Sequence, residues 1–212
     1  MNSSPNASLS PSQKSTASGL LDQTALSELA QRLVEAAKRA GADAADAIAV
    51  RGVSQGVEIR EGKVEESERS EGDDIGLRVF VGKRQAVVSS SDIGGDVAKL
   101  AERAVAMAKV SPDDEYVGLA DPALLARQFP DLDLLDPQMP SVAELERRAL
   151  EAEAAALAVK GVSKSGGSSA SSGIGGMVLV TSTGFHGSYL RSSQSVSAVA
   201  IAGEGTGMER DY

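Results

Sequence analysis

The sequence predicts an α+β protein: an N-terminal domain in which helices pack on a small, largely antiparallel sheet, followed by the first strands of a β-rich second module. Three observations support this prediction. Apolar residues recur with the helical period near residues 24–41, 91–111 and 141–160. Short β-branched runs separated by glycine-containing turns fill residues 45–91, and a further β pattern follows residue 176. Hydrophobic residues make up 42% of the 212 residues, enough for a core in one large domain or two small ones.

Residues 1–20 are rich in Ser, Pro and Asn and contain no apolar run, so we expect a disordered tail. A secretory signal would need a basic start and an apolar stretch of roughly 7–15 residues, which this segment lacks. No part of the chain approaches the roughly 20 apolar residues of a membrane span. The chain has no cysteine, which is typical of a reducing compartment. We therefore expect a cytoplasmic protein with no membrane partner.

The first predicted helix follows this tail, with Thr24 as the candidate N-cap and Gly41 as the C-terminal stop. The strands come next, and we expect a hairpin turn at residues 81–84. Helical spacing then returns, with Asp92 as the candidate N-cap and Pro112 beyond the helix end. Strands therefore lie between two amphipathic helices along the sequence.

A loop with five prolines leads to a third, alanine-rich helix, for which Ser141 and Glu144 form a capping box and Gly161 marks the approximate end. Residues 161–176 have the composition of a flexible linker but lead directly into a strand pattern, so their structure stays open. We divide the chain into the tail 1–20, an α+β domain at 21–160, and the first strands of an incomplete β-rich module at 161–212.

Residues 186–202 alternate as a long strand, with Tyr189 and Arg191 among serines on one face and Leu190 and Val196 on the other. We expect the Leu190 face to be buried. Tyr and Arg are frequent interface anchors, so Tyr189 and Arg191 are our candidate residues for contact with a partner or substrate. The alternative is an ordinary solvated strand face.

Charge and composition exclude several classes of function. The net charge is -9 and aromatic residues make up only 3% of the chain, which disfavours direct nucleic-acid binding. The sequence "VEIREGKVEESERSEGDD" at residues 57–74 holds eight acidic residues against three basic ones, without the calcium-loop spacing. We interpret it as solvated strand faces and turns, which can also oppose edge-to-edge aggregation.

His186 is the one histidine of the chain and lies among glycines and hydroxyls in "TSTGFHGSY". A catalytic zinc site takes about three protein ligands, commonly including a pair of histidines, and this sequence offers one histidine and no cysteine. No phosphate-binding loop, dinucleotide fingerprint or nucleophile elbow is present. We therefore interpret His186 as a structural turn position and assign no catalytic or metal-binding residue.

The order of helix, "GVEIREGKVEESERSEGDDIGLRVFVGKRQAVVSSSD", helix and "TSTGFHGSYLRSSQSVSAVAIAGEGTGMERDY" resembles the TldD/PmbA family, once called modulators of DNA gyrase. The resemblance covers residues 21–212. Its most specific pieces are "EGDDIGLRVFVG", "TSTGFHGSY" and "GMERDY", which are more similar to the PmbA (TldE) branch than to the TldD branch.

This resemblance implies a cytoplasmic, two-subunit metalloprotease that trims or degrades peptides. TldD-type subunits bear an H-E-x-x-x-H zinc motif, PmbA-type subunits generally do not, and this chain has none. We therefore expect no cofactor here and zinc only in a TldD-like partner; the expected partners are such a subunit or a second copy, and a peptide substrate. Family members are longer and carry the motif further along, so we expect an N-terminal portion without catalytic residues. The alternative is a non-enzymatic, gyrase-modulator-like interaction module.

Overall fold

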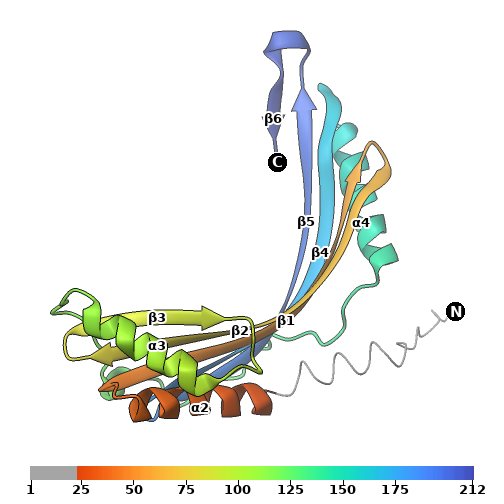
Figure 1. Cartoon of the computed structure of the whole chain (residues 1–212). Coiled ribbons are helices and arrows are strands. Elements are labelled where there is room, and N and C mark those ends of the chain that lie inside the picture. The colour runs from red at the N-terminus through yellow and green to blue at the C-terminus, as the bar shows by residue number, and fades with distance from the viewer. Residues whose placement is uncertain (1–22) are drawn as a thin grey trace, which may run out of the picture. The chain divides into compact units, whose positions relative to one another are not determined.

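The computed structural model describes residues 23–212 (Figure 1), so the predicted tail at 1–20 lies outside the described residues. The regular elements of the described part are three α-helices, six strands and two short 3-10 helices, Pro122–Leu124 and Gly205–Gly207. The helices are α2 (Thr24–Arg39), α3 (Val97–Val110) and α4 (Val142–Leu157). The strands are β1 (Ala44–Arg60), β2 (Lys63–Val81), β3 (Arg84–Ser90), β4 (Val162–Thr181), β5 (His186–Ala202) and β6 (Glu209–Asp211). None of these helices is long and apolar enough to cross a membrane.

The strands form one antiparallel sheet in the order β3-β2-β1-β4-β5-β6, and helices pack on it. This confirms the predicted α+β fold. The expected hairpin is also present: Val81 pairs with Arg84, and the register continues to Ile75 opposite Ser90. The two-residue turn suits Gly82, whose φ of 58° lies in the left-handed region.

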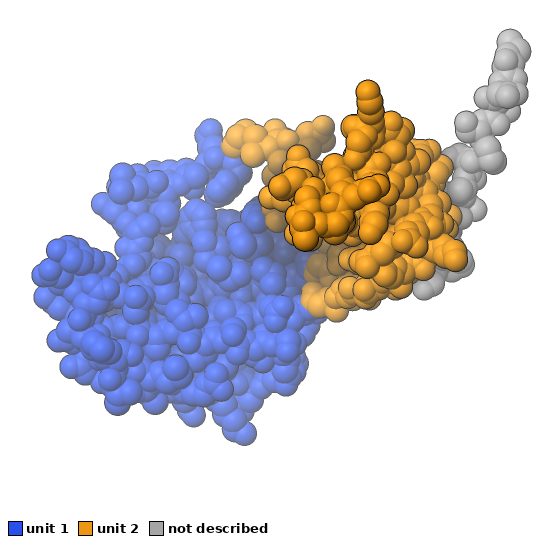
Figure 2. Space-filling model, turned by 90° about the horizontal axis from the view of Figure 1, so that it is seen from above, with its two compact units in different colours: residues 1–51, 73–129, 176–190 blue, residues 52–72, 130–175, 191–212 orange. Residues whose placement is uncertain are grey.

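The described residues group into two compact units (Figure 2). Unit 1 holds residues up to 51 with 73–129 and 176–190, and unit 2 holds 52–72, 130–175 and 191–212. Strands β1, β2, β4 and β5 each contribute residues to both units. We predicted a boundary at residue 160, between two continuous stretches of sequence, whereas each compact unit combines several separate stretches. The predicted domain division stays a prediction.

The core of unit 1 forms where α2 and α3 pack on alternate residues of the strands. Two expected N-caps were wrong. The N-cap of α2 is Gln23, because Thr24 already belongs to the helix. The N-cap of α3 is Asp96, whose carboxylate accepts hydrogen bonds from the N–H groups of Ala98 and Lys99. Asp92 instead accepts a hydrogen bond within the preceding turn.

Helix α4 forms the core of unit 2 by packing Leu145 and Ala149 against Val57, Ile59 and Ala170 of β1 and β4. The hydroxyl of Ser141 accepts a 3.2 Å hydrogen bond from the N–H of Glu144, which confirms the Ser141 half of the predicted capping box, while the Glu144 carboxylate accepts from Arg147 and Arg148. The helix ends at Leu157, earlier than expected from Gly161.

Apart from Gly161, which lies in a turn, the linker-like segment at 161–176 is part of β4, a strand of 20 residues between β1 and β5. This settles the question that the sequence left open, in favour of a strand rather than a flexible linker. The segment is rich in glycine and serine because its neighbours approach closely: a Cβ at Gly173 would lie 3.1 Å from the carbonyl oxygen of Val53. Strands β1 and β2 are likewise longer than the short runs we predicted, since Gly52, Gly56 and Gly72 lie within strands and not in turns.

Candidate functional site

The candidate contact residues Tyr189 and Arg191 lie on β5, a strand that is exposed or half-buried throughout. The Tyr189 side chain is 41% exposed, and Arg191 is exposed as well. The expectation that Leu190 and Val196 form a buried face was wrong, because no residue of β5 is buried and Val196 is 49% exposed. The unit 2 core forms under α4, on β1 and β4, and β6 pairs only with residues 200–202 of β5.

Tyr189 lies in unit 1, where the backbone of β5 is fixed to the start of α2. The side-chain amide of Gln23 donates a 2.8 Å hydrogen bond to the carbonyl oxygen of Tyr189. Gly176 of β4 leaves room for this contact, since a Cβ there would lie 2.6 Å from Gln23 Nε2 and 2.8 Å from Leu190 Cδ2. The backbone of Tyr189 is therefore held while its ring stays accessible.

Arg191 lies in unit 2, where the segment at residues 134–136 hydrogen-bonds to its neighbour Ser192. The N–H of Ser192 donates to the carbonyl oxygen of Leu134 at 2.9 Å, and the N–H of Asp136 donates to the Ser192 hydroxyl at 2.9 Å. Arg148 of α4 donates a 2.6 Å hydrogen bond to Gln194. No ion pair within residues 23–212 engages Arg191, so its guanidinium is available to a partner.

His186 is the first residue of β5 and follows a tight turn. The N–H of Gly184 donates to the carbonyl oxygen of Thr181 at 3.1 Å, and Gly184 has a φ of 92°. His186 Nε2 lies 3.2 Å from the Ser27 hydroxyl of α2. His186 thus begins a strand directly after the turn in which we expected it, and its purely structural role stays a prediction.

A cavity of about 380 Å³ borders His186 and is lined mainly by polar side chains, among them Gln31 and Lys38. Within the described residues, no group of three or more His, Cys, Asp or Glu side chains is arranged to hold a metal ion. The acidic segment at 57–74 forms the hairpin end of β1 and β2, where every residue from 60 to 72 is exposed. This confirms that its charged part is solvated, while Val57 and Ile59 point into the core of unit 2.

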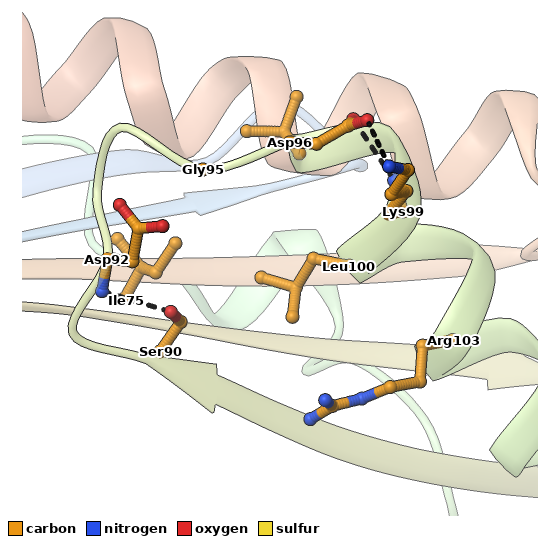
Figure 3. Close-up of a pocket in the computed structure, with 9 residues that line it drawn as sticks. Ile75, Ser90, Asp92, Gly95, Asp96, Lys99, Leu100 and Arg103 are labelled. Atoms are coloured by element: carbon orange, nitrogen blue, oxygen red, sulfur yellow. Dashed lines mark hydrogen bonds and ion pairs between the residues drawn. The ribbon is translucent and has the colours of Figure 1, made fainter.

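A second cavity, of about 270 Å³, lies at the start of α3 (Figure 3). Its walls include Ser90, Asp92, Asp96, Lys99 and Arg103. A helix N-terminus attracts anions through its free N–H groups. Here the Asp96 carboxylate already accepts from two of them, and therefore the chain's own acidic side chain occupies the position of an anion.

Glu153 of α4 is a buried carboxylate, 3% exposed, that binds the tip of the β1–β2 hairpin. It accepts hydrogen bonds from the N–H groups of Glu61 at 2.9 Å and Gly62 at 2.7 Å, and from the Ser165 hydroxyl. Burial alone raises the pKa of Glu153, but the hydrogen bonds from Ser165, Gly62 and Glu61 outweigh it and hold the pKa below its ordinary value.

We did not predict this role for Glu153. A signal was present, because positions 145, 149 and 153 recur at the helical spacing that places them on one face of α4. On the exposed side of the same helix, hydrogen bonds from Arg147 and Arg148 lower the pKa of Glu144 to about 2.

The sequence matches two domain models of one family. Residues 45–108 match the model described as PmbA/TldA metallopeptidase domain 1, and residues 135–212 match the PmbA/TldA metallopeptidase central domain. The chain therefore belongs to the PmbA/TldD family, as the sequence resemblance indicated.

Curated relatives point to the PmbA (TldE) branch within this family. The metalloprotease PmbA homolog of Haemophilus influenzae is 34% identical over 207 residues, which cover 96% of this chain and 46% of the relative. Metalloprotease PmbA of Escherichia coli O157:H7 is 35% identical over 158 residues, covering 74% of this chain and 35% of that protein. The chain thus spans less than half the length of these relatives and is a PmbA/TldE-like member of the family.

Solved structures share this fold. A Bacteroides thetaiotaomicron protein described as a modulator of DNA gyrase superimposes with a TM-score of 0.73 at 22% identity, over 86% of this chain and 42% of that one. TldE from Thermococcus kodakarensis gives a TM-score of 0.67 at 15% identity, over 85% of this chain and 40% of that one.

Proposed function

We propose that this chain is the N-terminal part of a PmbA/TldE-like subunit of a cytoplasmic TldD/TldE-type metalloprotease that processes or degrades peptides. The observation that carries the proposal is the ordered match of residues 45–108 and 135–212 to consecutive domains of this metallopeptidase family. Two relatives that bear the name metalloprotease PmbA support it.

The donor groups of this chain do not fit a catalytic zinc ion. Zinc in a peptidase takes nitrogen or carboxylate ligands from about three side chains. His186 is the chain's one histidine, there is no cysteine, and no suitable cluster exists among residues 23–212. In our proposal the zinc therefore belongs to a TldD-like partner that carries the H-E-x-x-x-H motif, and this chain supplies no catalytic residue.

Tyr189 and Arg191 are the side chains that we propose for contact with the partner or with the peptide substrate. The partner is a TldD-like subunit, or a second copy of this chain in a homodimer. Support comes from the exposure of Tyr189 and from the absence of any described ion pair at Arg191. Both residues extend from a strand whose backbone is fixed by neighbouring hydrogen bonds.

A non-enzymatic role is the second candidate. Two proteins of similar fold, from Bacteroides thetaiotaomicron and Thermotoga maritima, are described as modulators of DNA gyrase. Such a role would make this chain an interaction module that binds another protein directly.

Co-purification distinguishes the two roles. The full-length protein is tagged and expressed together with an H-E-x-x-x-H subunit, and separately with both gyrase subunits. Our proposal predicts a stoichiometric complex with the first and none with gyrase. A stable gyrase complex, without binding to the peptidase subunit, would show that the interaction-module role is correct.

A further inference from the structure

Residues 63–72 of β2 form an open sheet edge. In the strand order, β2 has only β3 and β1 as neighbours, and β3 pairs with β2 only from Ile75 to Val81. Over residues 63–72 the outer edge of β2 therefore has no strand beside it in the described part of the chain. Unpaired N–H and C=O groups along such an edge can hydrogen-bond to another extended segment.

Nothing within unit 2 covers this edge. Every residue from 60 to 72 is exposed, including the apolar Val64 at 46%. The hairpin is nevertheless anchored, because Glu153 binds the N–H groups of its turn residues Glu61 and Gly62. An added strand would thus meet a positioned edge and would displace no part of the described chain.

The charges along this edge select the kind of strand that fits. Glu65 pairs with Arg60 at 3.2 Å, and Glu71 pairs with Arg69. Glu66 and Glu68 have no cationic partner among residues 23–212. Their positions are two apart, so their side chains project from the same face of β2.

That face borders a groove of about 390 Å³ in unit 2. Glu66 and Glu68 line it together with Glu58 of β1, and small residues such as Ser54 and Ser169 line it as well. Three glutamates therefore line one polar groove, which extends from β2 across β1 to β4. Cross-strand neighbours lie about 4.5–5.5 Å apart, within reach of a lysine or arginine on an added strand.

We propose that the edge of β2 at residues 63–72 binds an extended peptide that carries Lys or Arg at alternate positions. The backbone of the peptide pairs with β2, and its cationic side chains lie on the groove face opposite Glu66 and Glu68. A second copy of the same edge is disfavoured, because its glutamates would oppose these glutamates. This inference goes beyond the proposed function and does not depend on any role in a peptidase.

The test uses a fluorescent, end-capped peptide of alternating lysine and threonine, titrated with the full-length protein at about 0.15 M salt. Fluorescence anisotropy gives the dissociation constant. We expect the double variant Glu66→Lys, Glu68→Lys to bind about 10-fold more weakly or worse, because it replaces attraction by repulsion. The control variant Glu102→Lys, Glu115→Lys changes the net charge equally at exposed positions in unit 1 and should bind within about twofold of wild type.

A second peptide separates strand pairing from charge attraction. It has the same sequence but is N-methylated at alternate residues, which removes the N–H donors of one edge and should weaken binding about 10-fold. Equal binding of both peptides, equal loss in the control variant, or no binding of the unmodified peptide would overturn the proposal. The proposal would also be overturned if the protein forms dimers and the double variant Glu66→Lys, Glu68→Lys dissociates them. A second copy of the chain would then be the occupant of this edge.

Discussion

The Glu153 carboxylate of α4 accepts a 2.7 Å hydrogen bond from the backbone N–H of Gly62 and thereby joins the helix to the hairpin turn of β1 and β2. Gly62 has a φ of 72° and its neighbour Glu61 a φ of 52°, so both N–H groups of this turn point toward one acceptor. The contact is local to unit 2, and Glu153 is the only buried charged residue of α4.

Replacing Glu153 with glutamine should destabilise unit 2. The amide keeps one acceptor oxygen but directs an NH₂ group toward a donor, so we expect a loss of about 1–3 kcal/mol in the free energy of unfolding. Urea denaturation measures this loss. The control Glu151→Gln, on the exposed side of α4, should cost under about 1 kcal/mol. Equal effects of the two substitutions would show that the hairpin contact contributes little.

The same carboxylate predicts a pH dependence. The pKa of Glu153 is lower in the folded chain than its ordinary value, so its stabilising contribution is complete above the ordinary carboxyl pKa and is lost as the pH falls through the folded value. The stability difference between wild type and Glu153→Gln should therefore shrink in acid. Denaturation curves recorded from neutral pH downward measure it, and a constant or growing difference would contradict this assignment.

Glycines within the strands, such as Gly166 of β4 and Gly72 of β2, should tolerate side chains only where neighbours leave space. A Cβ at Gly166 would lie 2.6 Å from Val199 Cγ1, whereas one at Gly72 would meet nothing within 4 Å. We expect Gly166→Ala to destabilise the protein by about 1–3 kcal/mol through overpacking. Gly72→Ala should change stability little or raise it slightly. Thermal unfolding of the two variants checks this order, and the reverse order would mean that β4 and β5 do not pack as described.

The periodic parts of the fold could be predicted from the sequence, and the parts that depend on distant neighbours could not. Apolar spacing predicted the helices, and the turn at Gly82 was predicted because a two-residue hairpin leaves a local signal. The segment at 161–176 has the local composition of a linker, yet it is a strand because β1 and β5 pair with it on both sides. The N-cap of α3 was misplaced because Asp92 and Asp96 are chemically equivalent in sequence and only the backbone distinguishes them.

For the candidate site, local periodicity could likewise predict which positions share a face of the strand, but not which of them are buried. Alternation along residues 186–202 correctly placed Tyr189 and Arg191 at exposed positions of one strand. It could not show that Leu190 and Val196 lack a buried face, because burial depends on whether another layer covers β5. The helical spacing of positions 145, 149 and 153 indicates that Glu153 shares the packed face of α4. It could not show that the carboxylate reaches a turn about 90 positions earlier in the chain, since that contact depends on how α4 packs on the sheet.

Arg191 offers a direct test of the contact residues. Arg191→Ala should weaken binding to the peptidase partner or its peptide by about 1–2 kcal/mol and leave thermal stability nearly unchanged, because the side chain is exposed. Calorimetric titration and thermal unfolding of the full-length protein measure the two quantities. If the substitution leaves the binding affinity unchanged, or lowers affinity and thermal stability together, then this face of β5 has no role in binding.

The donor set of the chain predicts that residues 1–212, purified alone, hold no stoichiometric zinc, since His186 is their one histidine and they contain no cysteine. Elemental analysis after dialysis against a weak chelator measures the metal content. One tightly held zinc per chain that disappears in His186→Ala would overturn the structural interpretation of His186.

The central claim, that this chain belongs to a peptidase assembly without supplying its catalytic group, is tested most directly by peptide hydrolysis with two matched variants. The full-length protein and its H-E-x-x-x-H partner are reconstituted, and cleavage of a short unfolded peptide is followed by mass spectrometry. We predict that replacing the motif glutamate of the partner with glutamine abolishes cleavage, whereas His186→Ala in this chain leaves cleavage largely intact. Cleavage that survives the partner's substitution and is lost with His186→Ala would contradict the account.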